Sequence, residues 1–333
     1  MWSRFLVALP GPPGCRDRCW TYLARQSAQY VGSADAYGVC VIRREHRAAG
    51  FEYLELVTAL LHRVRTNDAT NGLWEAADLQ WWWRRDQHPD PAHQIFWFDD
   101  DTPVAAVIFT NWGGRWGCDV VSATGDPSTV SDVVWPRALE QINRLGSGSV
   151  EVIARDDDAT LLEALANAGF ESTGEVTVAT WMRTTGRPEV SPLPNGFALL
   201  SRIETPQRAH HMIQRNGEHV ADRLAECSLY RAELDLVVYA PNGDVASYGL
   251  FWADPVTGVG LVEPMRTEDA YQGLGLARHV LTSGLDRLAA HGCSSLKVSY
   301  IEGNDAARRL YIGAGFSPRS TSSTYRLGQQ MPG

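Results

Sequence analysis

Apolar and polar positions alternate at two different periods along the chain. Residues 52–65 place Leu54, Val57, Leu61 and Val64 on one face and predict an amphipathic helix. Around the turn at residues 99–102, the segments 94–98 and 104–111 have the pattern of a β-hairpin. Further along, the pattern predicts helices over residues 76–85, 133–145 and 160–168, and strands over 119–122, 149–154 and 175–182.

A linker interrupts this order at residues 183–196, which contain three prolines, two glycines and polar spacers. After the linker the order of elements repeats. Strands are predicted over residues 197–202, 235–240, 245–252, 259–263, 295–300 and 321–327, and helices over residues 210–226, 276–291 and 305–313. The pair Asn242-Gly243 joins two of these strands as a hairpin turn.

The repetition is visible in the residues themselves. Ala168-Gly169-Phe170 and Ala314-Gly315-Phe316 lie 146 residues apart, and the same offset pairs residues 149–152 with residues 295–298. We therefore predict an α/β fold in two tandem copies, each a mixed, mainly antiparallel sheet with flanking helices. The predicted division is an extension of no assigned function at 1–40, a first domain at 41–184, a linker at 185–195 and a second domain at 196–333.

Composition narrows the classes of function. The 333 residues are 44% hydrophobic and 21% charged, with a net charge of −9, which argues against a nucleic-acid binder. No apolar run is long enough for a membrane span or a signal sequence. Six cysteines show no disulfide framework, and Cys15 and Cys19 lack the second ligand pair of a zinc site. We expect a cytoplasmic protein without a metal, and a monomer is compatible with the sequence.

A strand, a loop with two glycines and a helix follow one another near residues 259–291. Unpaired amides at a helix start suit a phosphate, and Gly273 and Gly275 let the backbone approach it closely. Arg278 stands where a dinucleotide-binding loop has its third glycine, and the Gly-Lys-Ser/Thr of a P-loop is absent. A turn that uses its glycines only for packing stays an alternative.

Two motifs in order resemble the GNAT acetyltransferases. Gln272-Gly273-Leu274-Gly275-Leu276-Ala277 is similar to the loop Gln/Arg-x-x-Gly-x-Gly/Ala of that family. The segment from Asn304 to Phe316 resembles its Asn-x-x-Ala-x-x-x-Tyr-x-x-x-Gly-Phe signature. The close match covers about 60 residues, and the element order extends the resemblance to two tandem GNAT-type domains, the plan of mycothiol synthases.

The resemblance implies acetyl-CoA as cosubstrate and gives residues roles. The amides of Gln272–Ala277 would cradle the pyrophosphate, and Tyr311 would protonate the departing thiolate, although a core tyrosine is the alternative. Glu263 is the best general base, and Glu218, His219 and Asp254 stay open. The full set of residues implied to bind the cofactor is Met265, Arg266, Thr267, Gln272, Gly273, Leu274, Gly275, Leu276, Ala277, Asn304 and Ala307.

The first copy departs from these motifs. At the same offset of 146, Asp126–Ser131 replaces the glycine loop, Asp158 replaces Asn304 and Leu165 replaces Tyr311. We therefore expect one catalytic site, in the second copy, with the first copy shaping the substrate wall. The expected reaction is acetyl transfer to a small-molecule primary amine by direct attack. The alternatives are a non-catalytic acyl-CoA-binding or sensing protein and a protein lysine acetyltransferase.

Overall fold

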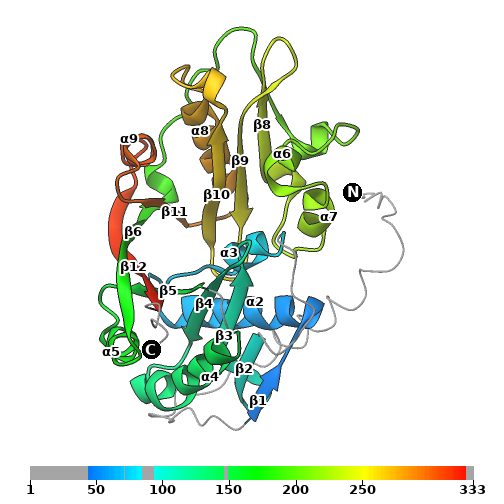
Figure 1. Cartoon of the computed structure of the whole chain (residues 1–333). Helices are drawn as coiled ribbons and strands as arrows, with labels where there is room; N and C mark the ends of the chain where they lie inside the picture. The colour runs from blue at the N-terminus through cyan, green and yellow to red at the C-terminus, as the bar shows by residue number, and fades with distance from the viewer. Residues whose placement is uncertain (1–43, 71, 85–93, 146–148, 328–333) are drawn as a thin grey trace, which may run out of the picture. The chain divides into compact units, whose positions relative to one another are not determined.

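Twelve strands form one continuous sheet in the computed structural model, which describes residues 44–70, 72–84, 94–145 and 149–327 (Figure 1). The predicted extension at 1–40 and the Cys15 and Cys19 pair lie outside these residues. We call the described residues up to 183 the first half and those from 198 the second half. The predicted boundaries at 184 and 196 fall within one compact unit, Val41–Gly333, and stay predictions.

The first half contains the predicted elements and, in addition, β1 and a π-helical turn that the pattern did not predict. Its elements are β1 (Arg44–Arg47), α2 (Gly50–Asn67), α3 (Ala76–Trp82), β2 (Gln94–Asp99), β3 (Thr102–Asn111), β4 (Arg115–Ser122), a π-helical turn (Thr129–Val134) continuing into α4 (Trp135–Leu145), β5 (Ser149–Arg155), α5 (Ala159–Asn167) and β6 (Phe170–Arg183). The predicted helix at 52–65 and the predicted hairpin at 94–111 are confirmed.

The second half repeats this order. Its elements are β7 (Ala198–Ser201), α6 (Ile213–Asn216), α7 (Val220–Ala225), β8 (Asp235–Tyr239), β9 (Val245–Ala253), β10 (Val259–Thr267), α8 (Leu276–Ala290), β11 (Ser295–Ile301), α9 (Asp305–Gly313) and β12 (Ser317–Leu327). The single helix predicted over residues 210–226 is wrong. Gly217 adopts φ +85°, which an α-helix does not accommodate, and separates α6 from α7.

The two halves exchange their last strands. In the sheet order β1-β2-β3-β4-β5-β12-β6-β11-β10-β9-β8-β7, β12 of the second half lies between β5 and β6 of the first. In turn, β6 lies between β12 and β11. Both strands pair antiparallel with both neighbours, for example Ser322 with Arg155 and Leu296 with Met182. Figure 1 shows the green β6 beside the red β12. Each half therefore completes the sheet of the other.

Among the described residues, two hydrophobic clusters pack against the elements that carry the site. One joins α2 and α3 of the first half to second-half residues such as Met212 and Trp252, so it packs the halves against each other. The other lies beneath α8, whose residues Val280, Leu281 and Leu285 are fully buried. Here α8 comes so close to β9 that a Cβ built on Gly284 would lie 2.1 Å from ring atoms of Phe251. Gly284 thus fixes how α8, and the loop before it, sit on the sheet.

We expect Gly284→Ala to lower the free energy of unfolding by about 1–3 kcal/mol, because the added methyl overpacks a core that cannot move aside. Gly313→Ala is the matched control, since a Cβ at that helical position meets only the end of Arg278 at 3.8 Å. The control should be stabilised by about 0.5–1 kcal/mol. Urea unfolding curves of the two variants measure both effects, and equal stability changes would contradict this packing.

Candidate active site

Strands β10 and β11 pair in parallel only over Val259–Leu261 and then separate. At the separation, the register of β10 against β9 shifts between Val262 and Met265. The indole Nε1 of Trp252 donates a hydrogen bond of 2.7 Å to the carbonyl oxygen of Glu263 and anchors the backbone at this irregularity. The sheet therefore opens at Glu263, next to a fixed point of the chain.

The residues predicted to bind the pantetheine arm follow this opening. Met265, Arg266 and Thr267 pair with β9 on one side, while the pairing with β11 ends at Leu261. Their β11-facing edge is therefore not used by a strand among the described residues. An extended ligand could add to such an edge through main-chain hydrogen bonds. The geometry is compatible with the predicted role, which stays a prediction.

The glycine loop opens directly onto the start of α8. Gly273 and Gly275 have φ values of +76° and +81°, a left-handed conformation that favours glycine. Gly275 is the N-cap of α8 and supplies no side chain to its first amides. A Cβ at either glycine would meet nothing within 4 Å, so the space in front of the loop is open. Gln272 and Leu274 are exposed there, and Leu276 is buried and anchors the helix.

Asn304 has a structural role that the sequence motif does not reveal. Its side-chain oxygen accepts a hydrogen bond of 3.1 Å from the amide of Ala307 and caps α9. Asp158, its counterpart in the first half, caps α5 in the same way through Leu161. This equivalence supports the repeat offset of 146. The predicted binding of the cofactor by Asn304 and Ala307 stays a prediction.

Tyr311 is buried on α9, with 8% of its area exposed, and packs against Tyr300 and Phe316. Burial, together with the charge of Glu263, raises the pKa of Tyr311 to about 12. The phenol therefore keeps its proton at neutral pH, as a general acid must before it donates. Its first-half counterpart, Leu165, is buried as well but has no proton to give.

Glu263 faces a residue of the first half. Helix α3 packs on β10, and the carboxyl group of Asp78 is hydrogen-bonded to that of Glu263. Burial, followed by the charge of Asp78, raises the pKa of Glu263 well above its usual range. Burial also raises the pKa of Asp78, partly opposed by the charge of Lys297. Asp78 could not be identified from the sequence, because no motif indicates that a helix of one half packs on β10 of the other half.

Asp119 lies at the matching position of the first half. Arg115 pairs with Ser149 as Val259 pairs with Ser295, and four residues further along each strand come Asp119 and Glu263. Asp119 accepts a hydrogen bond of 3.0 Å from the indole of Trp74. Burial, with a smaller contribution from Asp78, raises its pKa to about 7. The sequence offset of 146 places Glu263 against Gly117, so the strand register in the structure was needed to identify Asp119.

A buried ion network supports the same region. Glu75 accepts hydrogen bonds from Arg65, one of them 3.0 Å long, and forms an ion pair of 2.9 Å with Lys297 of β11. Although burial opposes it, the two cations hold the pKa of Glu75 below its usual value. Lys297 also donates to the carbonyl oxygen of Leu73, so a charged residue of the second half is fixed in the first.

The other candidate bases lie in different surroundings. Glu218 and His219 are exposed next to α7. Asp254 is buried, lies 3.0 Å from His62 Nε2 and accepts the amide of Val256 in a turn. Those contacts already use its carboxylate. Among the four predicted candidates, Glu263 is the one whose charge contributes to the raised pKa of Tyr311.

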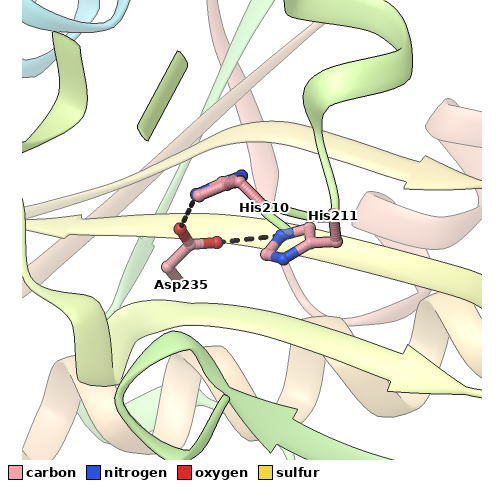
Figure 2. Close-up of side chains that lie close together, drawn as sticks. All are labelled: His210, His211 and Asp235. Carbon is pink, nitrogen blue, oxygen red and sulfur yellow. Dashed lines mark hydrogen bonds and ion pairs between the residues drawn. The ribbon is translucent and has the colours of Figure 1, made fainter. Parts of the chain in front are cut away.

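Figure 2 shows a second buried polar cluster, in which Asp235 contacts His210 and His211. Both histidine Nε2 atoms lie 3.0 Å from its carboxylate, and the Tyr230 hydroxyl donates to it at 2.8 Å. Nδ1 of His210 accepts the amide of Met212 at 3.3 Å, which assigns the ring proton to Nε2 and directs it at Asp235. His210 therefore acts as a hydrogen-bond donor to Asp235, whereas both ring nitrogens of the buried His211 lack a hydrogen-bond partner among the described residues.

Comparison with known proteins agrees with this geometry. Residues 199–316 match the model of the Acetyltransferase (GNAT) family. Among solved structures, a tandem GNAT protein from the clavulanic acid biosynthesis pathway aligns with TM-score 0.61 at 12% identity, covering 87% of this chain and 99% of its own. A GCN5-related N-acetyltransferase from Sphaerobacter thermophilus aligns with TM-score 0.54 at 14% identity, covering 84% and 94%.

These likenesses establish the tandem GNAT fold. A GNAT-family acetyltransferase from Colwellia psychrerythraea adds a third, with TM-score 0.54 at 13% identity, covering 86% of this chain and 100% of its own. No curated protein matches the sequence significantly. In the part of the chain that the structure describes, every helix is too short or too polar to cross a membrane.

The raised pKa of Asp119 gives a test of the buried carboxyl groups. Its folded-state pKa of about 7 exceeds the ordinary value of 3.8, so the folded protein binds more protons between these values and loses stability as pH rises through them. Relative to Asp119→Asn, the wild type should lose up to about 4 kcal/mol of unfolding free energy between pH 4 and pH 8. Urea unfolding across this range measures the difference, and a pH-independent difference would contradict it.

Proposed function

We propose that this chain, whose residues 199–316 match the model of the GNAT acetyltransferase family, transfers the acetyl group of acetyl-CoA to the primary amine of a small molecule by direct attack. One observation carries the proposal. The open glycine loop before α8 and the buried, protonated Tyr311 both belong to the half in which β10 and β11 separate. Phosphate binding, an open strand edge and a proton donor are the parts that such a reaction requires.

Acetyl-CoA fits the residues of the second half. The uncapped amides at the start of α8 would bind the pyrophosphate, because a helix N-terminus carries partial positive charge and unpaired donors. The free edge of Met265–Thr267 would bind the pantetheine arm by main-chain hydrogen bonds. The bound thioester supplies the acetyl group. Held beside the amine in attack geometry, it would react with a barrier lowered by several kcal/mol.

Two side chains would move protons. Tyr311 would donate to the sulfur as the C–S bond breaks, because its raised pKa keeps the phenol protonated until a strongly basic thiolate develops. Glu263 would accept a proton from the attacking nitrogen, directly or through water. Its position at the strand opening supports a role on the acceptor side, and its raised pKa would make it a stronger base than an exposed carboxylate.

We infer one catalytic site in each chain. In the first half Asp126 and Pro127 precede the π-helical turn, and the side chain of Asp126 accepts the amide of Ser128. A carboxylate repels a pyrophosphate, and proline has no amide to offer. The first half would instead form part of the acceptor wall, through α3.

Cys118, Cys227 and Cys293 are free buried thiols, which supports a reducing cytoplasm as the compartment.

A bulky acid in the loop should abolish cofactor binding. In Gly275→Glu the side chain would enter the space that the pyrophosphate requires and add like charge, so we expect acetyl-CoA affinity to fall at least about 100-fold. Gly125→Glu, which places the same charge in open space in the first half, should bind like the wild type. Calorimetry measures both. Unchanged affinity of Gly275→Glu would remove the loop from the site.

Removal of the phenol should affect turnover and not binding. We expect Tyr311→Phe to keep its acetyl-CoA affinity and to lower kcat by about 10²–10⁴-fold, the usual contribution of a positioned proton donor. The ring stays in its contacts with Tyr300 and Phe316, which preserves the core. Thiol release with the best available amine measures kcat. A rate equal to that of the wild type would leave Tyr311 with a packing role alone.

A further inference from the structure

The proposed base is in contact with the half that lacks the family motifs. Asp78 lies in the first turn of α3 and is buried, with 3% of its area exposed. One of its carboxylate oxygens accepts the amide of Glu75 at 2.7 Å, so the group cannot rotate away. The carboxyl group is also hydrogen-bonded to Glu263 on β10. Helix α3 of the first half thus holds the carboxyl group of Asp78 against strand β10 of the second half.

Only one of the two groups can be fully ionised in this position. Two carboxylates within hydrogen-bonding distance in a buried site repel strongly, and a hydrogen bond between them requires a proton. The charged and titratable groups around the pair do not remove this constraint. Asp78 faces Glu75, Asp119 and Lys297, and Glu263 faces Arg84, Lys297 and Tyr311. Lys297 is already paired with Glu75, and Arg84 donates to Asn216.

We propose that Asp78 is a positioning residue for catalysis, which holds Glu263 through a shared proton so that the two halves build one proton-accepting pair. This inference rests on the proposed function, since it concerns the acceptor side of the same site. If Asp78 has this role, the first half contributes a residue to proton transfer and also forms part of the wall of the acceptor site. The exchange of β6 and β12 and the packing of α3 on β10 keep the two carboxyl groups in register.

An acceptor that arrives as an ammonium ion loses two protons when its nitrogen becomes an amide. The first passes to the pair, which carries one negative charge and becomes neutral, and then leaves to solvent. The free amine attacks the thioester carbon, a C–N bond forms and the C–S bond breaks. The second nitrogen proton replaces the one that Tyr311 gives to the sulfur, and the enzyme returns to its starting state.

A purely structural Asp78 would behave differently. As a helix cap it needs only an oxygen for the amide of Glu75, and asparagine supplies that oxygen as well as aspartate does. Asparagine differs in its contact with Glu263, where it carries no charge and donates an amide hydrogen. Asp78→Asn therefore separates capping from proton sharing.

The first measurement is the pH dependence of kcat/KM with acetyl-CoA and an active amine. In Asp78→Asn, the Glu263 carboxylate exchanges the O–H donor of the shared proton for a weaker amide donor, so its single negative charge is less stabilised and the acidic limb should move to higher pH by about one unit, with unchanged acetyl-CoA affinity. Asp222→Asn, the same change in the first turn of α7 where the side chain is exposed, should leave the limb in place. If the acidic limb of the kcat/KM profile of Asp78→Asn lies at the same pH as that of the wild type, the proposal is wrong.

A second measurement does not depend on activity. Infrared difference spectra between wild type and variants should show, at neutral pH, a protonated carboxyl band that shifts in frequency or disappears in both Asp78→Asn and Glu263→Gln. A band that keeps its frequency and intensity in either variant contradicts a shared proton, and if Asp78→Asn fails to fold, Glu263→Gln still decides. If no amine supports thiol release from the wild type, the proposed function fails, while the infrared band still reports on the pair.

Discussion

Backbone hydrogen bonds in the middle of the sheet tie each half of the chain to the other. Because β12 lies between β5 and β6, and β6 between β12 and β11, neither half has a complete sheet from its own strands. Separating the halves would break three strand pairings, β5 with β12, β12 with β6 and β6 with β11, and leave their amides and carbonyls unpaired, which is costly in a buried position. The relative placement of first-half and second-half elements is therefore set by sheet register, and it is reinforced by the core that α2 and α3 share with the second half.

In the proposed function, this register gives the half without a glycine loop a part in the site. With the sheet continuous, α3 packs on β10 at the point where β10 leaves β11, and Asp78 comes against Glu263. Lys297 of β11 forms an ion pair with Glu75 of the first half, which adds a second contact between the halves in this region. In the proposed reaction the two halves would have different roles. The second would bind acetyl-CoA and supply Tyr311, and the first would close the acceptor side and tune the base.

Much of this could be predicted from the sequence, for identifiable reasons. The offset of 146 revealed the repeat, and the spacing of Asn304 and Tyr311 indicated the family. Strand exchange could not be predicted, because an alternating pattern shows which face of a strand is buried and not which strand lies beside it. β6 and β12 occupy equivalent places in the two copies, so either arrangement satisfies the same pattern. Asp78 was missed for the same reason, since its partner comes from the other copy.

The claim that the second half is an acetyltransferase, and not only a binding module, is tested most directly by thiol release. The wild-type protein would be incubated with acetyl-CoA and a panel of primary amines, with free CoA and the acetylated amine both quantified. The account predicts that at least one amine yields the two products in equal amounts. Saturable binding of acetyl-CoA with no release of thiol above the rate of the amine-free control, for any amine, would contradict it and favour a non-catalytic acyl-CoA-binding protein.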